Sequence, residues 1–245
     1  MATITLPTQV RAPLRSDPRF LILYGKPKVG KTTKMAELPN NLIIDIERGT
    51  DFISALAVQA NNYQELTEIF TALAAQKKLT GKNPYSYITI DSATKLEDWA
   101  EEVATVEYKK LTLAKTQQDM KTVLELEHGA GYGYIRTTFM RIVRKFTQVT
   151  DTLILIGHVN MSSINKDTEK SASKDLDLTG KLKRIAGSEA DAIGYMYRDI
   201  SEQLKVSFQT TEQDGVMGSR PIHLVNKDML FDWKDIFLDD KTLNP

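Results

Sequence analysis

The sequence of 245 residues contains no cysteine, which excludes disulfide bonds, thiolate metal sites and cysteine nucleophiles. It also carries no net charge, because 32 Lys and Arg residues balance 32 Asp and Glu residues. No overall field therefore attracts the chain to nucleic acid or membranes, and any such contact must come from a local patch. Histidine is scarce, and His128, His158 and His223 are too scattered to indicate a zinc site.

Long apolar runs are absent as well. The first residues lack the pattern of a signal peptide, and no stretch approaches the roughly 18 consecutive apolar residues of a membrane span. We therefore expect a soluble cytoplasmic protein without membrane contacts. The length suits one α/β domain with a full core. Residues 1–19 contain three prolines and are expected to form an irregular N-terminal arm, a candidate contact between subunits, before a single domain at 20–245.

Apolar runs and amphipathic segments alternate along this domain, which predicts an α/β fold with a mostly parallel sheet and helices on both faces. Continuous apolar runs indicate strands buried on both faces, at 20–24, 42–46, 87–90 and 153–156. Helical periodicity indicates helices at 31–38, 63–78, 96–111 and 135–149.

The remaining segments are less regular. Residues 112–133 form a long polar stretch with a glycine cluster, and residues 160–180 are expected to form a mobile loop. Two further strands are expected at 190–197 and 204–210. A turn around 214–219 then precedes residues 221–225, which indicates a C-terminal β-hairpin region.

One motif is highly specific. Residues 25–32, GKPKVGKT, match G-x-x-x-x-G-K-[ST], between a buried strand and the start of a helix. There the backbone N–H groups wrap a phosphate, Lys31 reaches the β- and γ-phosphates, and the Thr32 hydroxyl binds Mg²⁺. The alternative, a chance glycine-rich turn, does not explain the strand-to-helix setting. The sequence thus predicts a P-loop for ATP and Mg²⁺, with these binding residues: Gly25, Lys28, Val29, Gly30, Lys31, Thr32 and Thr33.

A P-loop needs a second acidic group to hold the metal. Asp91 directly follows the expected strand at 87–90, where such a carboxylate belongs. The alternative is an aspartate that only caps the end of a strand. We therefore predict that Thr32 and Asp91 are the two metal ligands.

Three segments, taken together with the P-loop, resemble the RecA-type recombinase core. LIIDIERGTD at 42–51 is similar to the strand that carries the catalytic glutamate, and ITIDSATKL at 88–96 to the Walker B strand. LILIGHVN at 153–160 is similar to the strand that ends in a polar sensor residue, where RecA has glutamine and this chain has His158. Residues 178–199 resemble the stretch that follows the DNA-binding loop. The histidine, the short arm and the lack of a large extra domain look more like the bacteriophage single-strand annealing ATPases of the Sak type.

The resemblance implies that Glu47 activates or orients the attacking water. A carboxylate just past a buried strand next to the P-loop strand is also placed for that role on physical grounds. The alternative is a surface carboxylate paired with Arg48. His158 is either a sensor of the γ-phosphate or an ordinary histidine at the sheet edge. With Lys31, these two residues form the predicted catalytic set.

The resemblance also implies single-stranded DNA and further copies of the chain, in a ring or filament, as partners, and a single-stranded-DNA-binding protein is a further candidate. Lys181, Lys183 and Arg184 are candidates for acting in trans on a neighbour's nucleotide; the alternative is a solvated edge or direct DNA contact. The DNA-contact candidates are Tyr132, Tyr134, Arg136, Lys166, Lys170 and Lys174. For the two tyrosines, partial burial against the following helix is the alternative.

Three functional hypotheses follow. The first is an ATPase that assembles on single-stranded DNA and promotes annealing or strand pairing. The others are a P-loop kinase of a small substrate and a nucleotide-gated scaffold with little turnover. A kinase predicts an arginine-bearing lid, whereas residues 160–180 are rich in lysine and aspartate.

Overall fold

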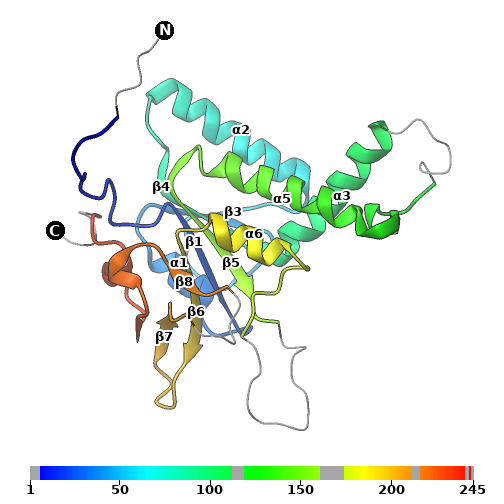
Figure 1. Cartoon of the computed structure of the whole chain (residues 1–245). Coiled ribbons are helices and arrows are strands. Elements are labelled where there is room, and N and C mark those ends of the chain that lie inside the picture. The colour runs from blue at the N-terminus through cyan, green and yellow to red at the C-terminus, as the bar shows by residue number, and fades with distance from the viewer. Residues whose placement is uncertain (1–5, 112–118, 161–173, 211–215, 241–242, 244–245) are drawn as a thin grey trace.

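The computed structural model describes residues 6–111, 119–160, 174–210, 216–240 and 243 (Figure 1). The strands are β1 (Phe20–Gly25), β2 (Asn41–Asp45), β3 (Ala57–Gln59), β4 (Tyr85–Asp91), β5 (Thr150–His158), β6 (Ala192–Arg198), β7 (Leu204–Ser207), β8 (Gly218–Ser219) and β9 (Asp228–Leu230). The helices are α1 (Lys31–Glu37), α2 (Tyr63–Thr80), α3 (Ala93–Leu111), α5 (Gly131–Phe146), α6 (Leu182–Glu189) and α7 (Trp233–Ile236). Three short 3-10 helices are η1 (Val123–Glu125), η2 (Glu127–Gly129) and η3 (Ile222–Leu224).

All described strands belong to one sheet, in the order β3-β2-β4-β5-β1-β6-β7-β9, with β8 paired to β6. The strands from β3 to β6 run parallel, and the pairs of β6 with β7 and β8, and of β7 with β9, are antiparallel. The mostly parallel α/β sheet predicted from the sequence is therefore confirmed. The carboxyl ends of parallel strands meet at one edge, which brings together Gly25, Asp45, Asp91 and His158.

Helices cover both faces of the sheet, as the sequence predicts. On one face, α2, α3, α5 and α6 pack over strand residues such as Ile22 and Ile44. On the other, α1 and α7 pack over residues such as Leu21 and Ile156. Because neighbouring side chains of β1 enter opposite cores, its whole run is apolar and buried.

The chain order of the strands differs from their order in space. The strand before Glu47, β2, does not lie next to the P-loop strand β1, because β5 and β4 lie between them. The expectation that they are neighbours is wrong. Crossover helices decide where each parallel strand joins the sheet, and that packing is not contained in the order of the segments.

The glycine-rich end of the polar stretch at 112–133 is helical. Helix α5 begins at Gly131 and not at residue 135. A Cβ on Gly131 would lie 1.9 Å from the carbonyl oxygen of Val123, so this glycine allows α5 to lie against η1. The glycine therefore permits a close contact between two elements. Residues 112–118 lie outside the described residues.

Two expectations for the second half of the chain need correction. Of the loop expected at 160–180, residues 161–173 lie outside the described residues, but the end of the loop is built into the core, because Leu176 is fully buried and bridges to Val159. Helix α6 then follows, at residues for which no helix is predicted from the sequence. Residues 221–225 carry the 3-10 helix η3, and the next strand is β9. The antiparallel region at the C-terminal side of the sheet nevertheless agrees with the prediction.

Residues 6–19 of the N-terminal arm are described, and of these, residues 6–16 are exposed. The end of the arm is held by the C-terminal segment, because the carboxylate of Asp17 accepts the N–H groups of Leu238 and Asp239 at 2.8 and 2.9 Å. The arm and this segment run together on one side of Figure 1. An inter-subunit role of the arm stays a prediction. Among the described residues, no helix combines the length and hydropathy needed to cross a bilayer.

Candidate nucleotide site

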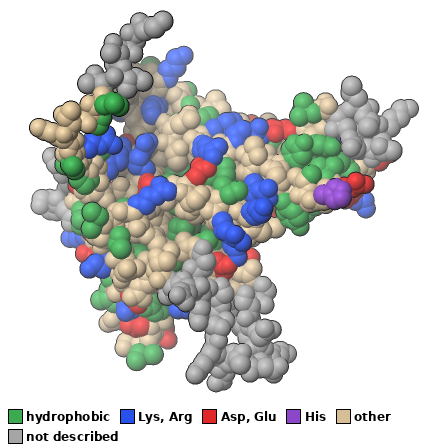
Figure 2. Space-filling model, in the orientation of Figure 1, with side chains coloured by type: hydrophobic (Ala, Val, Ile, Leu, Met, Phe, Trp, Pro, Cys, Tyr) green, Lys and Arg blue, Asp and Glu red, His purple; other side chains and the backbone are tan. Residues whose placement is uncertain are grey.

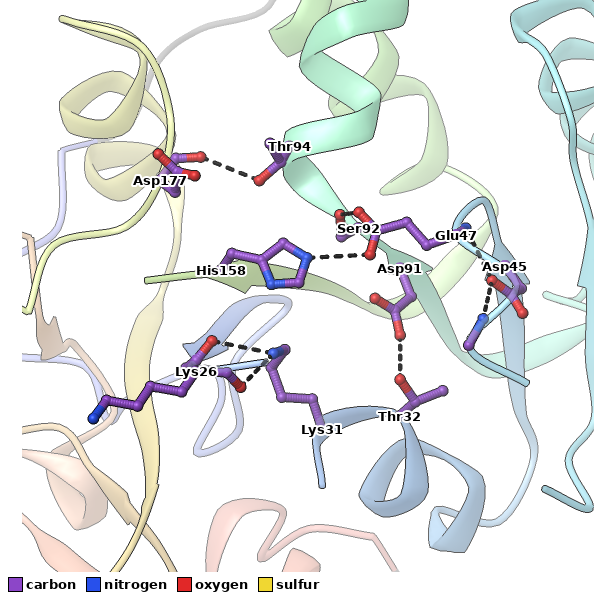
Figure 3. A network of polar contacts seen from close by, with 12 residues as sticks. Lys26, Lys31, Thr32, Asp45, Glu47, Asp91, Ser92, Thr94, His158 and Asp177 are labelled. Atoms are coloured by element: carbon purple, nitrogen blue, oxygen red, sulfur yellow. Dashed lines mark hydrogen bonds and ion pairs between the residues drawn. The ribbon is translucent and has the colours of Figure 1, made fainter. Parts of the chain in front are cut away.

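The P-loop, residues 25–32, leads from the end of β1 into α1. Lys28 and Gly30 adopt positive φ angles of 63° and 110°, which turn the loop back over the strand end. The ammonium of Lys31 donates to the carbonyl oxygens of Gly25 and Lys26, at 3.1 and 3.0 Å (Figure 3). Lys31 is buried, and this desolvation lowers its pKa, while Asp91 and Glu47 act in the opposite direction. A cation thus lies inside the loop, where a phosphate would meet it.

The other predicted P-loop residues take different positions. Val29 is buried, whereas Lys28 and Thr33 are exposed. Exposure leaves the Lys28 ammonium in solvent, so its part in phosphate binding stays a prediction.

Thr32 and Asp91, the predicted metal ligands, contact each other. The Thr32 hydroxyl donates to Oδ2 of Asp91 at 2.6 Å (Figure 3). Asp91 is only 4% exposed, and burial, with the charges of Glu47 and Asp45, raises its pKa to about 6. A divalent cation would compensate this buried carboxylate.

The donors fit Mg²⁺, which prefers hard oxygen ligands and keeps several waters and substrate phosphates around it. No group of three or more His, Cys, Asp or Glu side chains suited to a metal occurs in the described part of the chain. A cation at Thr32 and Asp91 would therefore complete its shell with nucleotide oxygens and water, as Mg²⁺ does.

Glu47 reaches across the strand ends from the loop after β2. Its carboxylate accepts hydrogen bonds from the hydroxyl of Ser92 and from Nε2 of His158, the latter at 3.1 Å (Figure 3). The His158 bond lowers the pKa of Glu47, and Ser92 and the charge of Lys31 act in the same direction. Burial opposes these contacts, but together they lower the pKa and favour the ionised carboxylate of Glu47. Arg48, the alternative partner, instead approaches the amide oxygen of Asn61 at 3.4 Å.

Asp45 shapes the loop that carries Glu47. It is 1% exposed, and its carboxylate accepts the N–H groups of Glu47, Gly49 and Thr50, and the Thr50 hydroxyl. Burial raises the pKa of Asp45, but these hydrogen bonds outweigh it and lower the pKa. Neither Asp45 nor Ser92 is among the site residues predicted from the sequence. A charged residue inside an otherwise apolar strand is the signal that would have found Asp45.

His158 also connects the site to the segment that follows residues 161–173. The carbonyl of His158 accepts the N–H of Asp177 at 2.9 Å, and Asn160 donates to the carbonyl of Asp175 at 2.8 Å. The Thr94 hydroxyl donates to the carbonyl of Asp177 at 3.3 Å (Figure 3). The described residues on either side of 161–173, Asn160 and Asp175 to Asp177, are thus hydrogen-bonded next to the histidine that holds Glu47.

The residues predicted to act in trans or to contact DNA lie outside the group of side chains around Glu47 and Asp91. Lys183 forms an ion pair with Asp175 of its own chain, whereas Lys181 and Arg184 are exposed. The ammonium of Lys174 lies over the rings of Tyr195 and Tyr197, at 5.2 and 5.8 Å from their centroids.

The two tyrosine candidates lie in the first turn of α5, where Tyr132 and Tyr134 are 41% and 42% exposed. Tyr134 packs edge-to-face on Tyr108 at 5.1 Å, which agrees with the alternative of partial burial. Arg136 is half-buried on the same helix. Lys166 and Lys170 lie outside the described residues.

The comparison with known families agrees with this geometry. The family model described as an AAA domain matches residues 17–230, which include the P-loop, Asp91, His158 and the strands up to β9. No curated protein matches the chain.

Proposed function

The chain belongs to the AAA-domain family, and from this premise we propose that it hydrolyses ATP with Mg²⁺ and uses the cycle to anneal or pair single-stranded DNA. One observation carries the hydrolytic part of the proposal. The ionised carboxylate of Glu47 is held by Ser92 and His158 at the same sheet edge as Lys31 and Asp91. This arrangement supplies a proton acceptor, a phosphate-binding cation and a metal-binding carboxylate in one place.

The proposed reaction begins with ATP in the P-loop. The backbone N–H groups and Lys31 bind its phosphates, and Thr32 and Asp91 would hold Mg²⁺, which neutralises phosphate charge when bound. Glu47 orients a water and accepts its proton as the water oxygen bonds to the γ-phosphorus. The bond from that phosphorus to the bridging oxygen breaks, and ADP and phosphate leave. The proton returns to solvent.

Two observations support the DNA part of the proposal: the basic side chains on α5 and α6, and the hydrogen bonds between the nucleotide site and the residues that follow 161–173. Lys and Arg side chains gather over α5 and α6 in Figure 2. Arg141 and Arg144 on α5 are engaged by Glu107 and Glu189, whereas Lys181 and Arg184 form no ion pair within the described residues. Through its bond to Asp177, His158 links the nucleotide site to the residues that follow 161–173, a segment that corresponds to the DNA-binding loop in the resemblance to RecA.

The resemblance also supports the finer assignment. We place the chain among the bacteriophage single-strand annealing ATPases, acting as a homo-oligomer in the cytoplasm of the host cell. A single-stranded-DNA-binding protein is a candidate partner in that setting.

Hydrolysis of ATP with and without single-stranded DNA tests the proposal. The wild-type protein is expected to release phosphate faster with DNA, and to accelerate annealing of complementary strands in the presence of ATP. Lys31→Ala is expected to stay folded and lose nucleotide binding, because the Lys31 ammonium contacts the loop carbonyls of Gly25 and Lys26, where it would meet the phosphates, and not the apolar cores. Transfer of phosphate to a small acceptor would support a kinase, and tight ATP binding without turnover would support a scaffold; either result would contradict the proposal.

A further inference from the structure

An arginine lies against the P-loop on the side away from Asp91 and Glu47. Strand β6 pairs with β1 in parallel, with Met196 opposite Gly25, so Arg198 at the end of β6 reaches the P-loop edge of the sheet. A Cβ on Gly30 would lie 3.6 Å from Nη2 of Arg198 and 3.9 Å from Cδ2 of Leu204. The hairpin of β6 and β7 therefore packs directly on the P-loop.

The backbone of this hairpin holds the guanidinium in place. Nη1 of Arg198 donates to the carbonyl oxygen of Glu202 at 2.6 Å. The carboxylate of Asp199 accepts the N–H groups of Ser201 and Gln203, at 2.9 and 3.0 Å, which closes the loop around Glu202. The orientation of Arg198 is thus set before any ligand arrives, and such preorganisation lowers the entropic cost of binding.

The charge of Arg198 is not compensated. Within the described residues Arg198 forms no ion pair, and the adjacent Asp199 uses its carboxylate for backbone N–H groups. By contrast, Lys205 of the same hairpin pairs with Asp228 at 3.5 Å and lies over the ring of Tyr197. An exposed, oriented and unpaired guanidinium beside a phosphate-binding loop is suited to bind an anion.

We propose that Arg198 binds the α- or β-phosphate of the nucleotide in the P-loop of its own subunit. The proposal rests on the proposed nucleotide binding at that loop. Glu47, Asp91 and His158, which surround the proposed site of attack on the γ-phosphate, come from the ends of β2, β4 and β5, on the other side of β1 from β6. Arg198 therefore contributes to nucleotide affinity and not to the chemical step, and it acts in addition to any cation from a neighbouring subunit.

Titration of ATP and ADP into four proteins tests this role. Arg198→Ala is expected to weaken both nucleotides by roughly 10-fold to 100-fold, the range for a charge-assisted hydrogen bond. Arg198→Lys keeps the charge and is expected to lose less. Lys205→Ala removes a cation from the same hairpin, and this matched control is expected to bind like wild type. In steady state, Arg198→Ala should raise KM for ATP while kcat stays within about twofold of wild type.

Three results would overturn the assignment. The first is a folded Arg198→Ala variant whose nucleotide affinity is unchanged. The second is a variant that loses ATP binding and kcat but still binds ADP. The third is a loss of affinity that is explained by a lower melting temperature of the variant. If the alanine variant does not fold, Arg198→Gln carries the test, because an amide can still donate to the Glu202 carbonyl without the charge. Failure of the wild-type protein to bind any nucleotide would instead overturn the proposed function.

Discussion

Glu47 lies between side chains that approach it from two strands, Ser92 after β4 and His158 at the end of β5. These contacts restrict the carboxylate to one position beside the predicted metal ligands. A glutamine at this position keeps the shape and can still bond to both neighbours, but it accepts no proton. Substitution of Glu47 by glutamine therefore separates ATP binding from the hydrolytic step.

Glu47→Gln is expected to bind ATP with near wild-type affinity and to lose about 100-fold to 10,000-fold in kcat, the usual contribution of a positioned general base. Phosphate release and equilibrium ATP binding are the two measurements. Glu68→Gln, an exposed position on α2, is the control and should change neither. Wild-type turnover in the Glu47 variant would show that Glu47 is structural.

Asp45→Asn tests the loop that carries Glu47. One oxygen of the carboxylate is replaced by an N–H donor that faces other donors, so part of its four hydrogen bonds is lost. We expect the free energy of unfolding to fall by about 1–3 kcal/mol and kcat to fall with it, since Glu47 loses its position. Denaturant melts and steady-state hydrolysis measure the two effects. Unchanged stability would remove this role from Asp45.

Among the elements, α5 depends on its first residues for its contact with η1. Gly131 faces the Val123 carbonyl so closely that a side chain cannot enter without moving the backbone. Gly133, two residues later in the same helix, would place a Cβ no closer than 3.7 Å to Nη2 of Arg136. The two glycines look alike in the sequence and differ in their surroundings.

Gly131→Ala is therefore expected to lower the free energy of unfolding by about 1–3 kcal/mol through overpacking. Gly133→Ala, its matched control, is expected to raise it by roughly 0.5–1 kcal/mol, because alanine favours the helix. Thermal or denaturant melting of both variants measures the difference. Equal effects would mean that α5 does not pack on η1 as described.

At the scale of the whole molecule, we predict that a neighbouring subunit completes the nucleotide site. Lys183 is engaged by Asp175 of its own chain, so Lys181 and Arg184 are the exposed cations of this group that remain available to a neighbour. A cation supplied in trans can accelerate phosphoryl transfer by about 10³-fold to 10⁵-fold. Both residues lie at the start of α6, next to the segment tied to His158.

Mixing two inactive variants tests such an assembly. Glu47→Gln and Lys181→Ala/Arg184→Ala subunits are each expected to lose ATPase activity alone. Combined, they should recover part of it, because some interfaces then join an intact Glu47 to intact cations. Light scattering establishes that the two variants co-assemble. No recovery in a co-assembled mixture, or full activity in a strictly monomeric enzyme, would remove the trans role.

The sequence alone determined the P-loop, the alternation of strands and helices, and the placement of Asp91 at a strand end. These features depend on a few contiguous residues, whose backbone geometry and burial pattern are local properties. Tertiary structure alone decided that β5 lies between β1 and β4, and thereby that His158 meets Glu47. It likewise decided that Arg198 rests on Gly30. Such contacts join residues up to 168 positions apart (30 to 198), and they follow from how the helices and strands pack around two cores, which no local pattern encodes.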